Sequence, residues 1–267
     1  MLGFDGIVIF LLLGSVVGFF AGLLGVGGGA IMVPILTSFF LYKNVPVESV
    51  VHLALGTSMA SIIMTSASSL YAHQKHQGVV WRIVKIMAPA VLIGTFAATY
   101  FVTHISSRHL AIFFALFMAY VSIQMFLNIR PKPSRTTPGK LALLTAGSGI
   151  GATSAVVAIG GGSLTVPFLA WYNIPLKKAI GTSSAIGFPI AVAGTLGYLV
   201  NGWSSAYQQE YLFGFIYLPA VVLISLVSYF TAPLGVKLVH RLPVPVLKKV
   251  FAVFLLLLGV KMLLSII

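Results

Sequence analysis

The chain has no cysteine, and only three of its 267 residues are acidic. Without cysteine it can form no disulfide bond, thiol redox pair or thiolate metal site. The acidic residues, Asp5, Glu48 and Glu210, stand away from the centres of the long apolar runs, so no buried carboxylate is offered for a proton or sodium pathway. The histidines near predicted helix ends have no gathered carboxylate or cysteine partners, and we expect neither a metal nor a cofactor.

Charged residues of either sign make up only 7% of the chain, whereas 59% of its residues are hydrophobic. Apolar runs of about 20 residues, the length that crosses a bilayer as a helix, recur along the whole sequence. The first run, 7–24, lacks the basic start and small-residue cleavage site of a signal peptide, and we expect a retained helix. The composition therefore predicts an all-α, polytopic membrane protein.

A basic linker with three prolines, 129–140, divides the chain into an N-terminal half, 1–128, and a C-terminal half, 141–267. Its prolines cannot continue a helix. Each half contains five apolar segments bounded by Pro, Gly or charged residues. We expect membrane segments at 7–24, 30–42, 46–72, 84–103 and 109–128, and again at 141–159, 163–172, 175–200, 212–236 and 245–267.

The two halves carry similar short motifs in the same order. Because each half has an odd number of segments, the second half enters the membrane from the opposite face, and we predict two inverted repeats. The matches are Gly25-Val26-Gly27-Gly28-Gly29 with Ala158-Ile159-Gly160-Gly161-Gly162, Val33-Pro34 with Val166-Pro167, Asn44-Val45-Pro46 with Asn173-Ile174-Pro175, Gly56-Thr57-Ser58 with Gly181-Thr182-Ser183, and Ala88-Pro89-Ala90-Val91 with Leu218-Pro219-Ala220-Val221.

The basic residues test this topology independently, because Lys and Arg accumulate in cytoplasmic loops. With both termini extracytoplasmic, 13 of the 16 Lys and Arg residues fall on the inner side, and only Lys43, Arg108 and Lys261 fall outside. This bias explains the net charge of +13 as a topology signal, so we expect a multi-pass protein in a lipid bilayer and no nucleic-acid partner.

The glycine clusters interrupt the apolar stretches, and the segment 30–42 would span only about 20 Å as a helix, less than the roughly 30 Å hydrocarbon core. Proline is tolerated in a first helical turn, so Pro34 and Pro167 predict discontinuous half-helices that begin at the glycines. Free N–H groups and the positive dipole end at each start favour an anion, although close helix packing through small residues is an alternative. The predicted binding residues are Gly27, Gly28, Gly29, Gly160, Gly161 and Gly162.

Two hydroxyl pairs lie about 10 to 16 Å into the helices that start at the Asn-x-Pro motifs, near enough to the midplane to contact an anion. For each hydroxyl, the alternative is a hydrogen bond to its own helix or to a neighbour. Five residues before the threonines stand His52 and Lys177, candidate gates for an anion or else an interfacial histidine and a marker of the inner side. The hydroxyl candidates are Thr57, Ser58, Thr182 and Ser183.

The paired Gly-rich/Val-Pro segments and the paired Gly-Thr-Ser elements, in a chain of this size, resemble the sulfite exporter TauE/SafE family over nearly the whole length. The resemblance implies a bacterial-type permease of the plasma (inner) membrane, with relatives associated with sulfite, organosulfonates and related sulfur-containing anions. The second motif departs from the first at Ala158, which stands in place of the first glycine, so close backbone approach is less favoured there.

We therefore predict a plasma-membrane transporter that carries sulfite, an organosulfonate or a related small anion by alternating access. A small carboxylate would satisfy the same donors, and the sequence leaves open the direction of transport and whether the protein forms a homo-oligomer. An enzyme is not expected, because no segment offers a nucleophile with a positioned base or a metal cluster. The remaining alternative is a membrane-embedded accessory subunit whose glycines pack against a partner helix.

Overall fold

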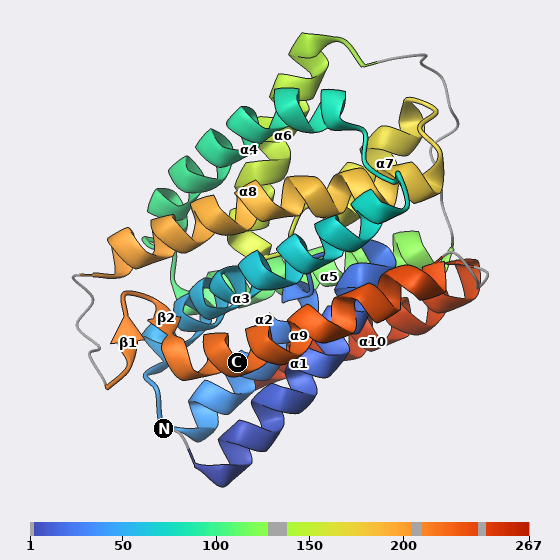
Figure 1. Ribbon diagram of the computed structural model, residues 1–267. Coiled ribbons are helices and arrows are strands. Elements are labelled where there is room, and N and C mark those ends of the chain that lie inside the picture. The colour runs from blue at the N-terminus through green and yellow to red at the C-terminus, as the bar shows by residue number, and fades with distance from the viewer. Residues whose placement is uncertain (1–2, 128–137, 204–209, 240–243, 267) are drawn as a thin grey trace.

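The computed structural model describes residues 3–127, 138–203, 210–239 and 244–266, so most of the predicted linker, 129–137, lies outside the described residues. The described part is almost entirely helical (Figure 1). The N-terminal half contains α1 (Phe4–Leu24), α2 (Gly29–Tyr42), α3 (Val47–Lys75), α4 (Trp81–Val102) and α5 (Ser107–Phe126). The C-terminal half contains α6 (Lys140–Val157), α7 (Gly162–Trp171), α8 (Leu176–Gly202), β1 (Leu212–Phe213), β2 (Ile216–Tyr217), α9 (Leu218–Val239) and α10 (Val244–Ile266).

Eight of the described helices are long and apolar enough to cross a membrane, which confirms a polytopic helical membrane protein. The two exceptions are α2, with 14 residues, and α7, with 10 residues. At the standard helical rise they extend about 21 Å and about 15 Å, too short to cross the hydrocarbon core. Both begin at a glycine cluster and carry a proline, Pro34 or Pro167, as their sixth residue, which places it in the second turn and not in the first turn as expected. The prediction of two short helices at the glycine clusters is confirmed.

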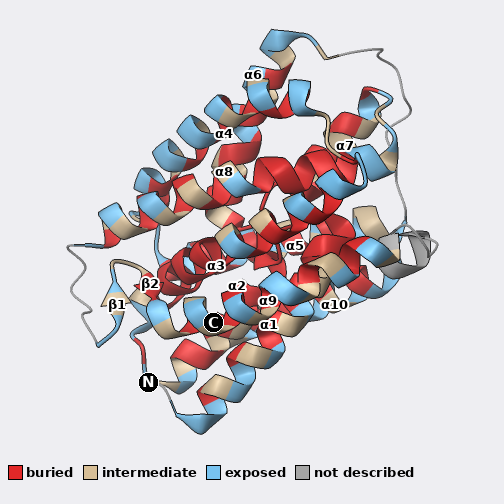
Figure 2. Ribbon diagram, in the orientation of Figure 1, coloured by how far each residue is buried: buried red, intermediate tan, exposed pale blue. Residues whose placement is uncertain are grey.

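Of the eight long helices, α3 and α8 are the most buried, and they lie at the centre of the bundle (Figure 2). Large apolar side chains on the outer helices remain exposed, among them Phe101 on α4, Leu116 on α5 and Phe230 on α9. A soluble protein would not leave so many contiguous apolar groups in water, whereas lipid tails accept them without cost. The outer helices therefore face the lipid, and α3 and α8 form the interior.

Helices from the two halves of the chain pack against each other in pairs. The most extensive contacts join α1 to α9 and α4 to α6 (Figure 1). In addition, α3 packs against α8, and α5 packs against α10. Small residues allow the close approach: a Cβ built on Gly22 of α1 would overlap the backbone of Ala232, and one on Gly151 of α6 would lie 2.6 Å from the Val91 carbonyl oxygen. Each half is therefore held together largely by helices of the other half.

The hairpin β1–β2 lies at one end of the bundle. The opposite end, called the linker end below, contains the ends of α3 and α5 and the starts of α4, α6 and α8. Leu212 pairs with Tyr217 in antiparallel register, and Gly214 takes a positive φ of 55° in the turn. The predicted membrane segment 212–236 is therefore wrong at its start, because α9 begins only at Leu218. The ring of Phe10 on α1 lies 6.3 Å from Tyr217, so α1 begins at the hairpin end.

The last of the five motif matches does not hold as a structural equivalence. Pro89 lies in the interior of α4, whereas Pro219 is the second residue of α9. A proline in a first turn loses no hydrogen bond, but an interior proline removes one, so the two positions differ physically. Ala88–Val91 and Leu218–Val221 therefore do not occupy equivalent positions in their helices.

Candidate functional site

The two glycine clusters form sharp breaks between consecutive helices. In the first, α1 ends at Gly25 with φ 69°, and Gly27 and Gly28 have φ 77° and 85° before α2 begins. In the second, α6 ends at Ala158 with φ 49°, and Gly161 has φ 78° at the start of α7. These left-handed conformations are favourable for glycine and cost a residue with a Cβ roughly 1–2 kcal/mol, so the sequence folds into breaks rather than continuous helices.

The two breaks cross and touch each other. A Cβ built on Gly27 would lie 2.8 Å from the Cα of Gly160, closer than real side chains approach. On one side of this contact, Gly29 lies against the carbonyl oxygen of Ala158. On the other side, Gly162 lies against the carbonyl oxygen of Gly25. The glycines therefore permit backbone-to-backbone contact between the two breaks.

Ala158 does not prevent close approach, contrary to the expectation from its side chain. Its carbonyl oxygen faces Gly29 just as the carbonyl of Gly25 faces Gly162. The contact is made by the backbone of Ala158 and the missing side chain of Gly29, so a methyl group at 158 is tolerated. The only free-energy cost that we assign to this methyl group is that of the left-handed φ of Ala158.

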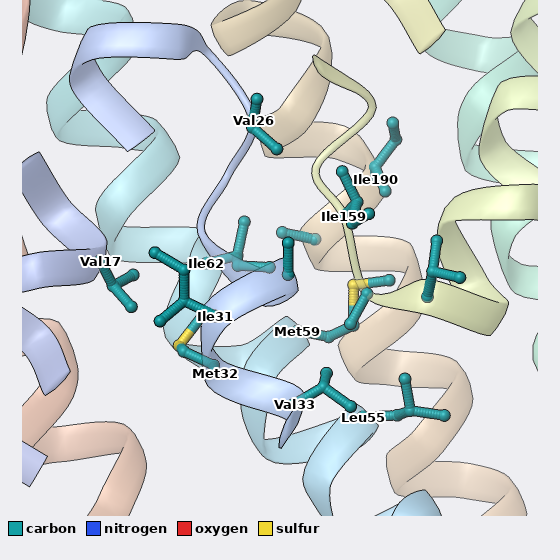
Figure 3. Packing of buried hydrophobic residues seen from close by; sticks show 14 of the residues in the cluster. Val17, Val26, Ile31, Met32, Val33, Leu55, Met59, Ile62, Ile159 and Ile190 are labelled. Atoms are coloured by element: carbon teal, nitrogen blue, oxygen red, sulfur yellow. The ribbon is translucent and has the colours of Figure 1, made fainter. Parts of the chain in front are cut away.

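The crossing lies at the middle of the two central helices. A Cβ built on Gly27 or Gly160 would lie 3.5 or 3.6 Å from Cγ2 of Ile62 on α3. A Cβ on Gly187 of α8 would lie 2.8 Å from the Gly160 carbonyl oxygen. Figure 3 shows hydrophobic side chains, Val17 and Ile62 among them, packed around this region. From here α2 runs toward the hairpin end, where its Phe39 ring meets α1, and α7 leads to the opposite end. The N-terminal ends of both short helices therefore lie inside the protein.

The two predicted threonine ligands bind backbone groups at the starts of two outer helices. The Thr57 hydroxyl accepts a hydrogen bond of 3.0 Å from the Tyr217 N–H, just before α9. The Thr182 hydroxyl accepts one of 2.9 Å from the Val80 N–H, just before α4. Both threonines are fully buried, and the structure does not bring them together. These contacts match the alternative of bridging a neighbour.

The two serines behave differently from the threonines. The Ser183 hydroxyl donates a 3.0 Å hydrogen bond to the carbonyl oxygen of Gly25, so it is attached to the first break. Ser58 is fully buried, and its hydroxyl has no hydrogen-bond partner within the described part of the chain. Only Ser183 is therefore connected directly to a glycine cluster.

The two candidate gates have unlike surroundings. The His52 ring is buried at the hairpin end, with Nε2 3.2 Å from the Val102 carbonyl oxygen and the ring 5.2 Å from that of Phe215. Its second nitrogen is 3.5 Å from the Ser107 hydroxyl. Lys177 is exposed at the start of α8, near the linker end. His52 thus joins three elements, whereas Lys177 faces the surroundings.

A cavity that the sequence did not indicate lies beside the start of α7. It has a volume of about 50 Å³ and separates α7 from α5. Its polar side chains are Ser163 and Gln124, and Leu24, Val121 and Val166 are among the apolar ones. Ser163 directly follows the second glycine cluster, which is the one signal that could have selected it; nothing in the sequence singled out Gln124.

A second, much smaller gap lies at the crossing itself. Its volume of about 10 Å³ is close to that of one water, and it is lined by glycines of both breaks and by serines of α3 and α8. The Ser69 hydroxyl donates to that of Ser184 at 3.1 Å, which links the two central helices. Among the described residues, no three His, Asp or Glu side chains gather in a way that would hold a metal ion.

Comparison with known proteins gives a match over most of the chain. A family model described as sulfite exporter TauE/SafE matches residues 10–262. A relative from Haemophilus influenzae is 38% identical over 265 residues, covering 98% of this chain and 100% of that protein. Relatives from Methanocaldococcus jannaschii and Bacillus subtilis are 26% and 24% identical and cover 87% and 94% of this chain, and 86% and 95% of their own lengths. All three are named probable membrane transporter proteins, and no solved structure matches the chain significantly.

Proposed function

The chain belongs to the sulfite exporter TauE/SafE family of membrane proteins, and we propose that it carries sulfite, an organosulfonate or a related small anion across the plasma membrane. The observation that supports this most is the meeting of two short helices, α2 and α7, by their N-terminal ends inside the bundle. The first N–H groups of a helix have no intrahelical acceptor, and the dipole adds partial positive charge there. An anion is the natural ligand for such a place.

The substrate class follows from what surrounds these helix ends. Neither the cavity beside α7 nor the gap at the crossing is lined by an acidic residue. A cationic substrate would have no counter-charge there, whereas backbone N–H groups and serine hydroxyls can donate to the oxygens of an anion. A small carboxylate would meet the same donors and is the second candidate substrate. Substrate competition separates the two.

We propose that the two halves are inverted repeats, and matched contacts support this. His73 of α3 lies 3.1 Å from the Gly22 carbonyl oxygen of α1, and the Tyr198 hydroxyl of α8 donates at 2.7 Å to the Ala155 carbonyl oxygen of α6. Gly22 corresponds to Ala155 when Gly25 is aligned with Ala158, and His73 corresponds to Tyr198 when Thr57 is aligned with Thr182. The Thr57 and Thr182 hydrogen bonds form a second matched pair. Such a repeat supports alternating access by exchange between two equivalent packings.

The orientation that we propose places the linker end in the cytoplasm and both termini outside. Lys75, Arg82, Lys140 and Lys177 all lie in or beside the connections at the linker end, as the bias of Lys and Arg toward cytoplasmic loops requires. A monovalent anion leaving a cell that is negative inside gains roughly 2.3 kcal/mol per 100 mV. Export therefore needs no coupling ion.

The test is flux of radiolabelled sulfite in proteoliposomes, followed by competition with methanesulfonate and acetate. We expect flux that responds to the sign of an imposed potential and that methanesulfonate inhibits more strongly than acetate does. Stronger inhibition by acetate than by methanesulfonate would indicate that the transported anion is a small carboxylate. A protein that moves none of these anions and instead co-purifies with a membrane partner would favour the accessory-subunit alternative, in which the glycines serve only packing.

A further inference from the structure

The cavity beside α7 has the dimensions and the position of a binding site rather than a packing defect. One water needs roughly 10–15 Å³, so a volume of about 50 Å³ admits an ion of a few heavy atoms. Its walls come from four helices or their ends: the end of α1, α5, α7 and α8. Val26, in the first break, and Gly162, in the second, both line it. The cavity therefore borders both breaks.

One buried polar group in this cavity has no partner. Ser163 is 8% exposed, and its hydroxyl oxygen is buried without a hydrogen-bond partner within the described residues. Buried hydroxyls are almost always hydrogen-bonded, because leaving one unpaired costs free energy. A ligand oxygen in the cavity would satisfy it.

The other polar groups around Ser163 can also donate hydrogen bonds. Ser163 is the second residue of α7, so its own N–H and that of Gly162 belong to the first turn, where N–H groups have no intrahelical acceptor. Gln124 of α5 adds a side-chain amide, which can also donate. No carboxylate lines the cavity, and both of its polar side chains can donate hydrogen bonds to an oxyanion.

We propose that this cavity is the binding site for the transported oxyanion, held by the Ser163 hydroxyl, the Gly162 and Ser163 N–H groups and the Gln124 amide. This inference rests on the proposed function and adds to it the residues that bind and the face from which they are reached. Gln124 lies in the last turn of α5, which leads to the linker. The anion therefore enters from the linker end.

The corresponding place in the first half is closed. Ala30 of α2 occupies the position of Ser163 when the glycine clusters are aligned, and it is fully buried. There α2 packs against α10, whereas on the other side the cavity separates α7 from α5. The structure is thus open at the α5–α7 seam and closed at the α2–α10 seam. Of the two short helices, only α7 has a hydroxyl side chain next to its first N–H groups.

The test is the affinity of the detergent-solubilised full-length chain for methanesulfonate and sulfite, measured by titration calorimetry. Ser163→Ala should weaken binding by about tenfold or more, because a hydrogen bond to a charged ligand is worth at least that much. Ser163→Thr keeps the hydroxyl and should retain most of the affinity, and Gln124→Leu should also weaken binding. The matched control is Ser225→Ala on α9, which removes another buried, unpartnered hydroxyl that does not line the cavity.

The outcomes separate this inference from the proposed function. Suppose that the wild-type chain binds and carries the anion and that Ser163→Ala binds it equally well. This result would overturn the cavity as the binding site but would leave the proposed transport function standing. Equal losses in Ser163→Ala and Ser225→Ala would overturn it too, since the effect would then be general. A wild-type chain that neither binds nor carries sulfite, methanesulfonate or acetate would overturn the proposed function and the site together.

Discussion

The Cα atoms of Gly27 and Gly160 face each other where the two helix breaks cross. A Cβ added to Gly27 would lie 2.8 Å from the Cα of Gly160, and one added to Gly160 would lie 3.1 Å from the Cα of Gly27. The residues are far apart in the sequence and come from different halves. Because neither has a side chain, the backbone of each can approach the Cα of the other. This contact brings the N-terminal ends of α2 and α7 to the same region of the bundle.

Substitution at this contact should destabilise the fold. Gly160→Ala is the mildest change, because Gly160 does not have a positive φ and the nearest atom to the new methyl group would be the Gly27 Cα at 3.1 Å. We expect a loss of about 1–3 kcal/mol, typical of an overpacked interior. Thermal unfolding in detergent measures it.

The control for that substitution is Gly149→Ala in α6. A Cβ at Gly149 meets nothing within 4 Å, and alanine is favoured over glycine in a helix by roughly 0.5–1 kcal/mol. The two variants should therefore shift the unfolding temperature in opposite directions. A Gly160→Ala protein as stable as the wild type would show that the breaks do not need their close contact.

The threonine hydroxyls should matter for stability rather than for affinity. Thr182→Val removes the acceptor for the half-buried Val80 N–H and should cost about 1–3 kcal/mol. Thr182→Ser keeps a hydroxyl and should recover most of that loss. Unfolding temperature and methanesulfonate affinity are measured on both variants. If Thr182→Val instead binds methanesulfonate more weakly than Ser225→Ala does, and its unfolding temperature is unchanged, Thr182 would be a ligand.

A tyrosine in the interior offers a similar test of the α6–α8 contact. Tyr198→Phe removes the 2.7 Å hydrogen bond to the Ala155 carbonyl oxygen at a fully buried position, and we expect a loss of about 1 kcal/mol. Tyr229→Phe is the control, since its ring is 42% exposed on α9. Chemical or thermal unfolding compares them. Equal effects in the two variants would contradict a stabilising role for the Tyr198 hydroxyl.

The topology can be tested with single cysteines, because the natural chain has none. Glu48→Cys, at the exposed start of α3, should react with a membrane-impermeant maleimide added to intact cells. Lys177→Cys, at the exposed start of α8, should react only after the membrane is permeabilised. Labelling of both residues from the same side would exclude the inverted arrangement, and a reversed pattern would reverse the orientation.

Much of the architecture could be predicted because each membrane segment is bounded by local signals. Segments expected at 30–42 and 163–172 became α2 and α7 to within a residue or two, since glycine and proline act on their immediate neighbours. The start of α9 was missed, because Leu212–Tyr217 is apolar enough to continue a helix and only its backbone pairing reveals a hairpin.

The site was less predictable than the fold. The sequence predicts that the glycines let the backbone approach a ligand, and it gives no sign that the two clusters also approach each other. The surroundings of Thr57 on α3 and Ser163 on α7 depend on how each helix is rotated about its axis. They depend also on which distant helix it packs against, which for both is α8. Hydrophobic periodicity hardly fixes rotation in helices that are apolar on all sides.

The most direct test of transport is sulfite flux into proteoliposomes under an imposed potential, comparing the wild-type chain with Ser163→Ala and Ser225→Ala. If the two short helices and the cavity beside α7 form an anion pathway, wild-type flux will reverse its preferred direction with the sign of the potential. Ser163→Ala will then need a substantially higher sulfite concentration for half-maximal flux, and Ser225→Ala will match the wild type. Wild-type flux at the level of protein-free liposomes, for sulfite and for the competing anions, would contradict the account.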